Sequence, residues 1–209
     1  MKKKLGIILI AVIILISGII YFVPQARLIF YVLYHNNIKS STEFTVDGDK
    51  LYMDGYICSK TPEQLKKVIK ENNEIKTIVM KDVLGSLDDE ANFPMSKYVR
   101  ESGLNTYLTK NSEVASGGTD FFLAGNKRTI EDGAKIGVHS WRDLAGTEAK
   151  DLPKTHEEHK IYTEYMNYML GNDDFYWYTI YAASAEDMHY MTNEEIIEYN
   201  VITEPIVQN

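Results

Sequence analysis

Strand-like and helix-like segments alternate along residues 44–124, and this alternation restricts the chain to a small set of folds. Short apolar runs at 77–80 and 105–108 predict buried strands. Helical patterns at 61–72 and 87–102 precede and follow the first of these strands. Strand–helix–strand units join parallel strands through right-handed crossovers. We therefore predict an α/β fold with a largely parallel sheet.

The N-terminal segment, residues 1–40, differs from the rest of the chain. Lysines at positions 2–4 precede an uncharged apolar run at 5–23, close to the roughly 20 residues that a membrane-spanning helix needs. The lysines favour the cytoplasmic side. We predict a single-pass anchor with a cytoplasmic N-terminus and an α/β domain, residues 41–209, outside the cytoplasm. A cleaved signal peptide is the alternative, but the run ends at 21–24 without a small-x-small cleavage site.

Composition excludes several classes of partner and cofactor. The formal net charge of −8 argues against nucleic-acid binding, which needs a basic surface. Cys58 is the one cysteine, so no internal disulfide can form. No phosphate-binding loop with a Gly-Lys pair is present, so we expect no use of ATP. His156 and His159 lack the four-residue spacing of a helical zinc motif, and we expect neither metal nor cofactor.

The stretch 114–139 holds the strongest chemical signal. Ser116 precedes two glycines and an apolar run at 121–124, and a short strand at 135–138 ends at His139. A serine hydroxyl is a poor nucleophile until a base accepts its proton, so the pair is a candidate nucleophile and base. From the residues alone, Ser116 could equally be the N-cap of the following helix, and His139 a buried histidine at a strand end.

Three blocks of the sequence resemble the Clp protease proteolytic subunit of the Clp/crotonase superfamily, and more closely its small exported or membrane-anchored relatives. The first block is IVM at 78–80 followed by GSLDDEA at 85–91. The second lies within 116–139 and contains SGGT, FFLAG and GAKIGVH; the third is MTNEEIIEYNVI at 191–202. The likeness covers residues 50–203 and implies a Clp/crotonase-type spiral of ββα units.

The resemblance also implies a role for each matching residue. Ser116 falls on the family's nucleophile and His139 on its general base. The backbone N–H groups of Gly85 and Gly117 fall on the two oxyanion donors, which must be fixed in place before the reaction. The function implied is that of a serine peptidase acting on a peptide or protein substrate.

Two positions depart from the family's pattern. Leu84 stands where the family usually has a glycine, beside the expected oxyanion donor. The position of the family's aspartate falls near Ser184, which is not an acid. We take Asp187 as the first candidate for the third catalytic residue that orients His139, with Glu186 and Ser184 as alternatives.

Other functions fit the same fold. A catalytically inactive binding or assembly module at the membrane is the main alternative to the peptidase, and Leu84 and the displaced acid favour it. Acyl-coenzyme A chemistry is less suited to an exported domain. Tyrosines predicted to pack between two late helices lie in a region that often joins subunits in this superfamily, so a homo-oligomer is expected. They are Tyr162, Tyr165, Tyr168, Tyr176, Tyr178 and Tyr181.

Overall fold

The structure is a computed structural model that describes residues 18, 21, 23–37, 40–143 and 145–208. The apolar run at 5–23, predicted to form the anchor, lies almost entirely outside these residues. No helix formed by the described residues is both long and apolar enough to span a membrane. The membrane topology stays a prediction from the sequence.

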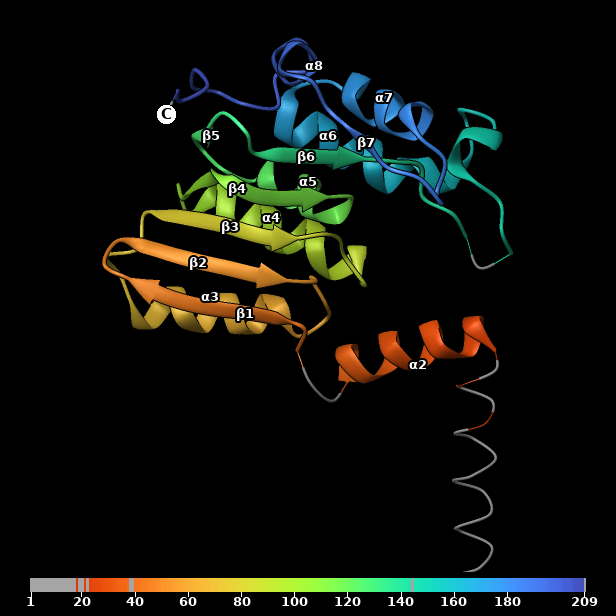
Figure 1. Cartoon of the computed structure of the whole chain (residues 1–209), viewed down its shortest axis with the longest axis horizontal. Helices are drawn as coiled ribbons and strands as arrows, with labels where there is room; N and C mark the ends of the chain where they lie inside the picture. Colours follow the sequence, from red (N-terminus) through yellow and green to blue (C-terminus); the bar gives the residue numbers. More distant parts are fainter. Residues whose placement is uncertain (1–17, 19–20, 22, 38–39, 144, 209) are drawn as a thin grey trace, which may run out of the picture.

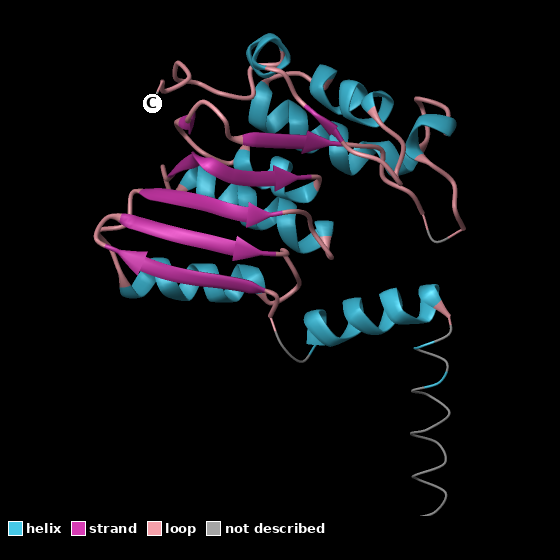
Figure 2. Ribbon diagram, viewed as in Figure 1, coloured by secondary structure: helices cyan, strands magenta, loops and turns pink. Residues whose placement is uncertain are grey.

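The described chain forms a sheet with helices packed against it (Figures 1 and 2). The α-helices are α2 (Pro24–Asn37), α3 (Thr61–Glu71), α4 (Asp89–Glu101), α5 (Gly117–Phe122), α6 (Lys160–Leu170), α7 (Asp174–Ala182) and α8 (Asn193–Glu198). The strands are β1 (Thr42–Asp47), β2 (Lys50–Gly55), β3 (Thr77–Val83), β4 (Asn105–Ala115), β5 (Arg128–Ile130), β6 (Lys135–Val138) and β7 (His189–Tyr190). Two 3₁₀ turns, η1 (Ala149–Asp151) and η2 (Glu157–His159), precede α6.

The sheet is mixed but largely parallel, as the strand–helix alternation predicts. Its strands follow the order β1-β2-β3-β4-β6-β7, and β5 also pairs with β4. The central pairs β2–β3, β3–β4 and β4–β6 are parallel, whereas β1 and β7 are antiparallel to their neighbours. Figure 1 shows α3, α4 and α5 together behind the sheet. Because β4 and β6 are parallel neighbours, their carboxyl ends lie at the same edge of the sheet.

The core lies between the sheet and these helices. Leu51 and Met53 of β2 and Ile78 and Met80 of β3 are fully buried, and Val99 of α4 is buried with them. Burial of each such side chain stabilises the fold by about 1.5–3 kcal/mol. The core thereby fixes β3 and β4, which lead directly into the candidate site.

Strand β4 is longer than its apolar pattern predicts. The sequence predicts a strand at 105–108, but β4 continues to Ala115. Its polar middle section is held by side-chain hydrogen bonds: the Ser112 hydroxyl donates to the carbonyl oxygen of Met80 at 2.6 Å and accepts from the N–H of Thr109 at 3.0 Å. The extension brings the chain to Ser116 at the carboxyl end of the sheet.

The tyrosine-rich helices pack against each other within the chain. Tyr165 of α6 and Tyr176 of α7 are almost fully buried, and the rings of Tyr162 and Tyr176 stack at 5.4 Å. This confirms the predicted packing between two helices. Tyr168 and Tyr181 are exposed, and the expected self-association stays a prediction.

Candidate functional site

Ser116 occupies a strained turn between β4 and α5. Its backbone has φ 53° and ψ −128°, a conformation that residues with side chains rarely adopt. Its N–H donates to the carbonyl oxygen of Gly137 at 3.1 Å, which holds the turn against β6. The side chain makes no helix-capping hydrogen bond, so a cap does not explain the serine. Strain of this kind costs about 1–3 kcal/mol and is often found at active sites.

The two glycines after Ser116 allow α5 to approach the end of β3. A Cβ atom on Gly118 would overlap the carbonyl oxygen of Val83, and one on Gly117 would overlap Ser86. The Asn92 side chain in α4 donates to the carbonyl oxygen of Gly117 at 2.8 Å. The turn is therefore held by β6 on one side and by α4 on the other. Its position requires residues 117 and 118 to have no side chain.

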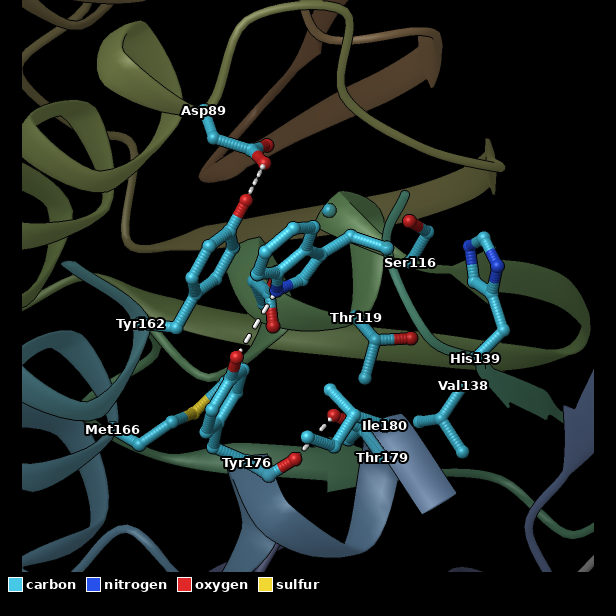
Figure 3. A pocket seen from close by; sticks show the side chains of 13 residues that line it. Asp89, Ser116, Thr119, Val138, His139, Tyr162, Met166, Tyr176, Thr179 and Ile180 are labelled. Carbon is cyan, nitrogen blue, oxygen red and sulfur yellow. Dashed lines mark hydrogen bonds between the residues drawn. The ribbon is translucent and has the colours of Figure 1, made fainter. Parts of the chain in front are cut away.

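His139 lies beside Ser116 because their strands pair. Ala115 of β4 is in register with Gly137 of β6, so the residues that follow emerge at the same edge. Both side chains line one cleft, whose wall also includes Ile29 of α2. Both also line the smaller pocket drawn in Figure 3. The structure contains no hydrogen bond between Ser116 and His139. Such bonds are often long in unliganded enzymes and shorten when substrate binds.

The half-buried imidazole of His139 is held towards its neutral form. Burial lowers its pKa, while the backbone of Ala185 and the negative charge of Glu148 act in the opposite direction. Its Nδ1 atom is buried and has no hydrogen-bond partner among the described residues. The neutral form is the one that can accept a proton.

The structure does not bring the predicted third residue to His139. Asp187 is exposed, and its carboxylate accepts from the N–H of Met188 at 2.8 Å. Of the alternatives, Glu186 pairs with Arg142 at 2.7 Å. Ser184 lies in the turn that the Asp187 N–H closes by donating to its backbone carbonyl.

Glu148 is the acid whose charge acts on His139, and the sequence comparison did not identify it. It comes from the loop after β6, which folds back through a bridge between Arg142 and Glu148. Hydrogen bonds from Lys150 and from the backbone of Ala185 lower the pKa of Glu148, so it is ionised. Gly146 in the loop after β6 is typical of a turn, and in the structure this turn is held by Asp143, which accepts from the N–H of Thr147 at 2.8 Å.

Two backbone N–H groups near Ser116 are free to bind an anion. Gly85 packs against the serine, with Ser116 Cβ 3.9 Å from where a Cβ atom of residue 85 would lie. Neither Gly85 nor Gly117 donates its N–H to any described residue. Leu84 is exposed, and its side chain does not line the cleft. The arrangement fits a pair of oxyanion donors despite the substitution at position 84.

Comparison with known proteins identifies the architecture. No protein family model and no curated protein sequence matches the chain. Among solved structures, a membrane-bound stomatin-specific protease in complex with a substrate peptide is 18% identical over 77% of this chain and 73% of its own, with a TM-score of 0.52. The chain has the Clp/crotonase fold. A second structure of that protease gives 18% identity, 77% of each chain and a TM-score of 0.53.

A third similar structure comes from Pseudomonas aeruginosa. It is 10% identical over 79% of this chain and 77% of its own, with a TM-score of 0.50. The resemblance predicted from three sequence blocks is thus confirmed for the fold. At these identities the likeness concerns architecture, and the chemistry must be argued from the side chains of this chain.

Proposed function

We propose that this protein is a membrane-anchored, ATP-independent serine peptidase that hydrolyses peptide bonds outside the cytoplasm. The observation that carries the proposal is the strained turn that holds Ser116 beside His139 in one cleft. The fold it shares with a protease whose structure contains a substrate peptide adds support.

Each residue of the site has a role in the proposed reaction. The Ser116 hydroxyl attacks a peptide carbonyl while His139 accepts its proton, and His139 then donates that proton to the departing amine. The N–H groups of Gly85 and Gly117 hold the oxyanion of the tetrahedral intermediate, each lowering the barrier by about 2.7–4 kcal/mol. Water activated by His139 hydrolyses the acyl-serine and restores the free hydroxyl.

Reaction with a fluorophosphonate probe tests the assignment. The probe forms a covalent adduct with a serine that a neighbouring base activates. We expect one adduct per chain, located on Ser116 by peptide mass spectrometry. A full-length, folded protein that forms no adduct, or forms it at another serine, would contradict the proposal.

We also propose Glu148 as the residue that orients and stabilises the His139 imidazolium. Replacing Glu148 by glutamine should lower kcat roughly 10²- to 10⁴-fold, because the imidazolium formed during the reaction loses its counter-charge. The Glu148 charge raises the pKa of His139, so its removal lowers that pKa further. Since only neutral His139 acts as a base, the acid limb of the pH profile of kcat/KM should move to lower pH.

Asp187→Asn is the matched comparison for Glu148→Gln, because both replace an acid by its amide. We expect Asp187→Asn to change neither kcat nor the acid limb. If Asp187→Asn caused the loss and Glu148→Gln did not, the acid chosen from the sequence would be the functional one.

The alternative is an inactive binding module on the same fold. The absence of a hydrogen bond between Ser116 and His139 is the observation that favours it. The module and the peptidase differ in the fluorophosphonate experiment, since a module with an unactivated serine forms no adduct.

The proposed anchor rests on the sequence of residues 1–23. A membrane-spanning helix there would keep the full-length protein in the membrane fraction during alkaline extraction, whereas a protein that starts at residue 41 would be released. Release of the full-length protein would contradict the anchor and leave the peptidase proposal intact.

A further inference from the structure

A small pocket extends from Ser116 and His139 into the domain. Its volume is about 50 Å³, and aromatic rings form much of its wall. Trp141 stacks on Tyr162 at 5.6 Å and donates its indole N–H to the Tyr176 hydroxyl at 3.0 Å. At about 10–15 Å³ per water, such a volume holds about three to five waters, which matches one slender side chain better than an aromatic ring.

Two carboxylates line this pocket, Asp89 and Asp120. Asp120 lies four residues after Ser116 on α5, and its N–H donates to the Ser116 carbonyl at 3.1 Å. This bond closes the first turn of α5, so Asp120 follows Ser116 by one helical turn. Both residues line the same pocket. Its carboxylate accepts no hydrogen bond from any described residue.

Asp89 approaches from another element, the first turn of α4. Its carboxylate accepts from the Tyr162 hydroxyl at 3.1 Å (Figure 3). The pocket's remaining walls are apolar or neutral apart from His139, and no lysine or arginine lines it. Two acids thus share a pocket without a basic partner.

Burial makes both acids hard to ionise in the empty pocket. Burial raises the pKa of Asp120 well above its usual value, and the charge of Asp89 raises it further. Burial also raises the pKa of Asp89, although the hydrogen bond from Tyr162 acts against it. A cation in the pocket would favour the ionised forms of both acids.

We propose that this pocket binds the lysine side chain of the residue whose carbonyl Ser116 attacks. Lysine has a flexible four-carbon stem and a compact ammonium group, which suit a small pocket with two acids in its wall. The rings of Trp141, Tyr162 and Tyr176 flank the stem and favour a cation by cation–π attraction. Arginine has a wider planar group, and the volume disfavours it. This inference rests on the proposed peptidase function and assigns its substrate class.

Phosphonate probes that carry an amino-acid side chain test the pocket directly. Two aminoalkyl phosphonates are compared on the full-length protein: one with the lysine side chain and one with the norleucine side chain, which has the same stem and no charge. The lysine probe should label Ser116 about 10- to 100-fold faster, as expected for a charge-assisted contact in a pocket.

Substitution of Asp120 shows whether the carboxylate causes this preference. Asp120→Asn should remove most of the preference for the lysine probe and leave the norleucine rate within about twofold. Glu90→Gln is the matched control, because Glu90 is an exposed acid next to Asp89 and does not line the pocket. It should keep the full preference. Thermal unfolding of each variant establishes that it is folded.

The preference should also depend on pH. Because the pKa of Asp120 is raised, the carboxylate is neutral at low pH and ionises only as the pH rises through that elevated value. His139 and Asp89 also titrate near the pocket, but His139 affects both probes equally. The lysine-to-norleucine rate ratio should therefore increase with pH in the parent and increase less in Asp120→Asn, where Asp89 is the pocket acid left to ionise.

The outcomes separate this inference from the proposed function. If a simple fluorophosphonate labels Ser116 but the norleucine probe reacts as fast as the lysine probe, the lysine pocket is wrong and the peptidase stands. An unchanged preference in Asp120→Asn also overturns the pocket. If the simple probe fails to label Ser116, the peptidase proposal itself fails, and the pocket assignment fails with it.

Discussion

Replacing Ser116 by alanine is expected to lower kcat/KM for peptide hydrolysis about 10⁶-fold and to abolish fluorophosphonate labelling. The variant has no hydroxyl to attack the carbonyl, and the remaining parts of the site can only bind and polarise the substrate. Replacing His139 by alanine should cause a loss of similar size, because the hydroxyl then has no base. The double variant should be little worse than either single variant, since the two residues act as one unit.

Hydrolysis of a fluorogenic peptide and covalent labelling measure this effect independently. Ser102→Ala is the matched control: Ser102 is an exposed serine at the end of α4, and its replacement should leave both measurements unchanged. Persistence of labelling in Ser116→Ala would identify a different nucleophile. Equal hydrolysis by the parent and Ser116→Ala would mean that the observed activity belongs to a contaminant.

Replacing Gly118 by alanine should destabilise the domain by about 1–3 kcal/mol or more. The added Cβ atom meets the Val83 carbonyl oxygen, which belongs to the backbone and cannot rotate away. For a domain of this size, each kcal/mol lowers Tm by about 2–4 °C. Because the same glycine positions the turn at Ser116, labelling should slow even in molecules that remain folded.

Gly85→Ala is the appropriate comparison for Gly118→Ala. A Cβ atom on Gly85 meets the Tyr56 ring at 3.6 Å and Ser116 Cβ at 3.9 Å, both ordinary contact distances. Its Tm should therefore stay close to that of the parent. A Gly118→Ala variant with an unchanged Tm would show that α5 can move away from β3 and that the turn at Ser116 is not rigid.

Local patterns in the sequence were sufficient to predict the sheet and the candidate pair of Ser116 and His139. Strand–helix alternation predicted the parallel sheet. A serine at a glycine-rich junction and a histidine at the end of a following strand predicted a candidate pair, and both side chains line one cleft. The length of β4 was underestimated because Ser112 satisfies its polar section through a contact with β3. Such a contact between distant segments leaves no periodic signal.

The acids of the site depend still more on tertiary structure. Glu148 reaches the neighbourhood of His139 only because a turn folds the loop back, whereas Asp187, which is closer to the family's position, points into solvent. Asp89 and Asp120 belong to different helices, α4 and α5. In the sequence, each looks like an ordinary acid in the first turn of a helix. Only the packing of α4 against α5 places both in one pocket.

The shape of the cleft depends on helix α2, which comes before the α/β domain in the chain. Ile29 lines the same cleft as Ser116 and His139, and Tyr31 contacts Tyr56 edge-on at 6.5 Å, so α2 forms one wall. A shortened protein that starts at residue 41 retains every proposed catalytic group but lacks this wall. Its cleft would be open on the side that α2 closes. Probe-labelling rates measured with the short form would therefore differ from those of the full-length protein.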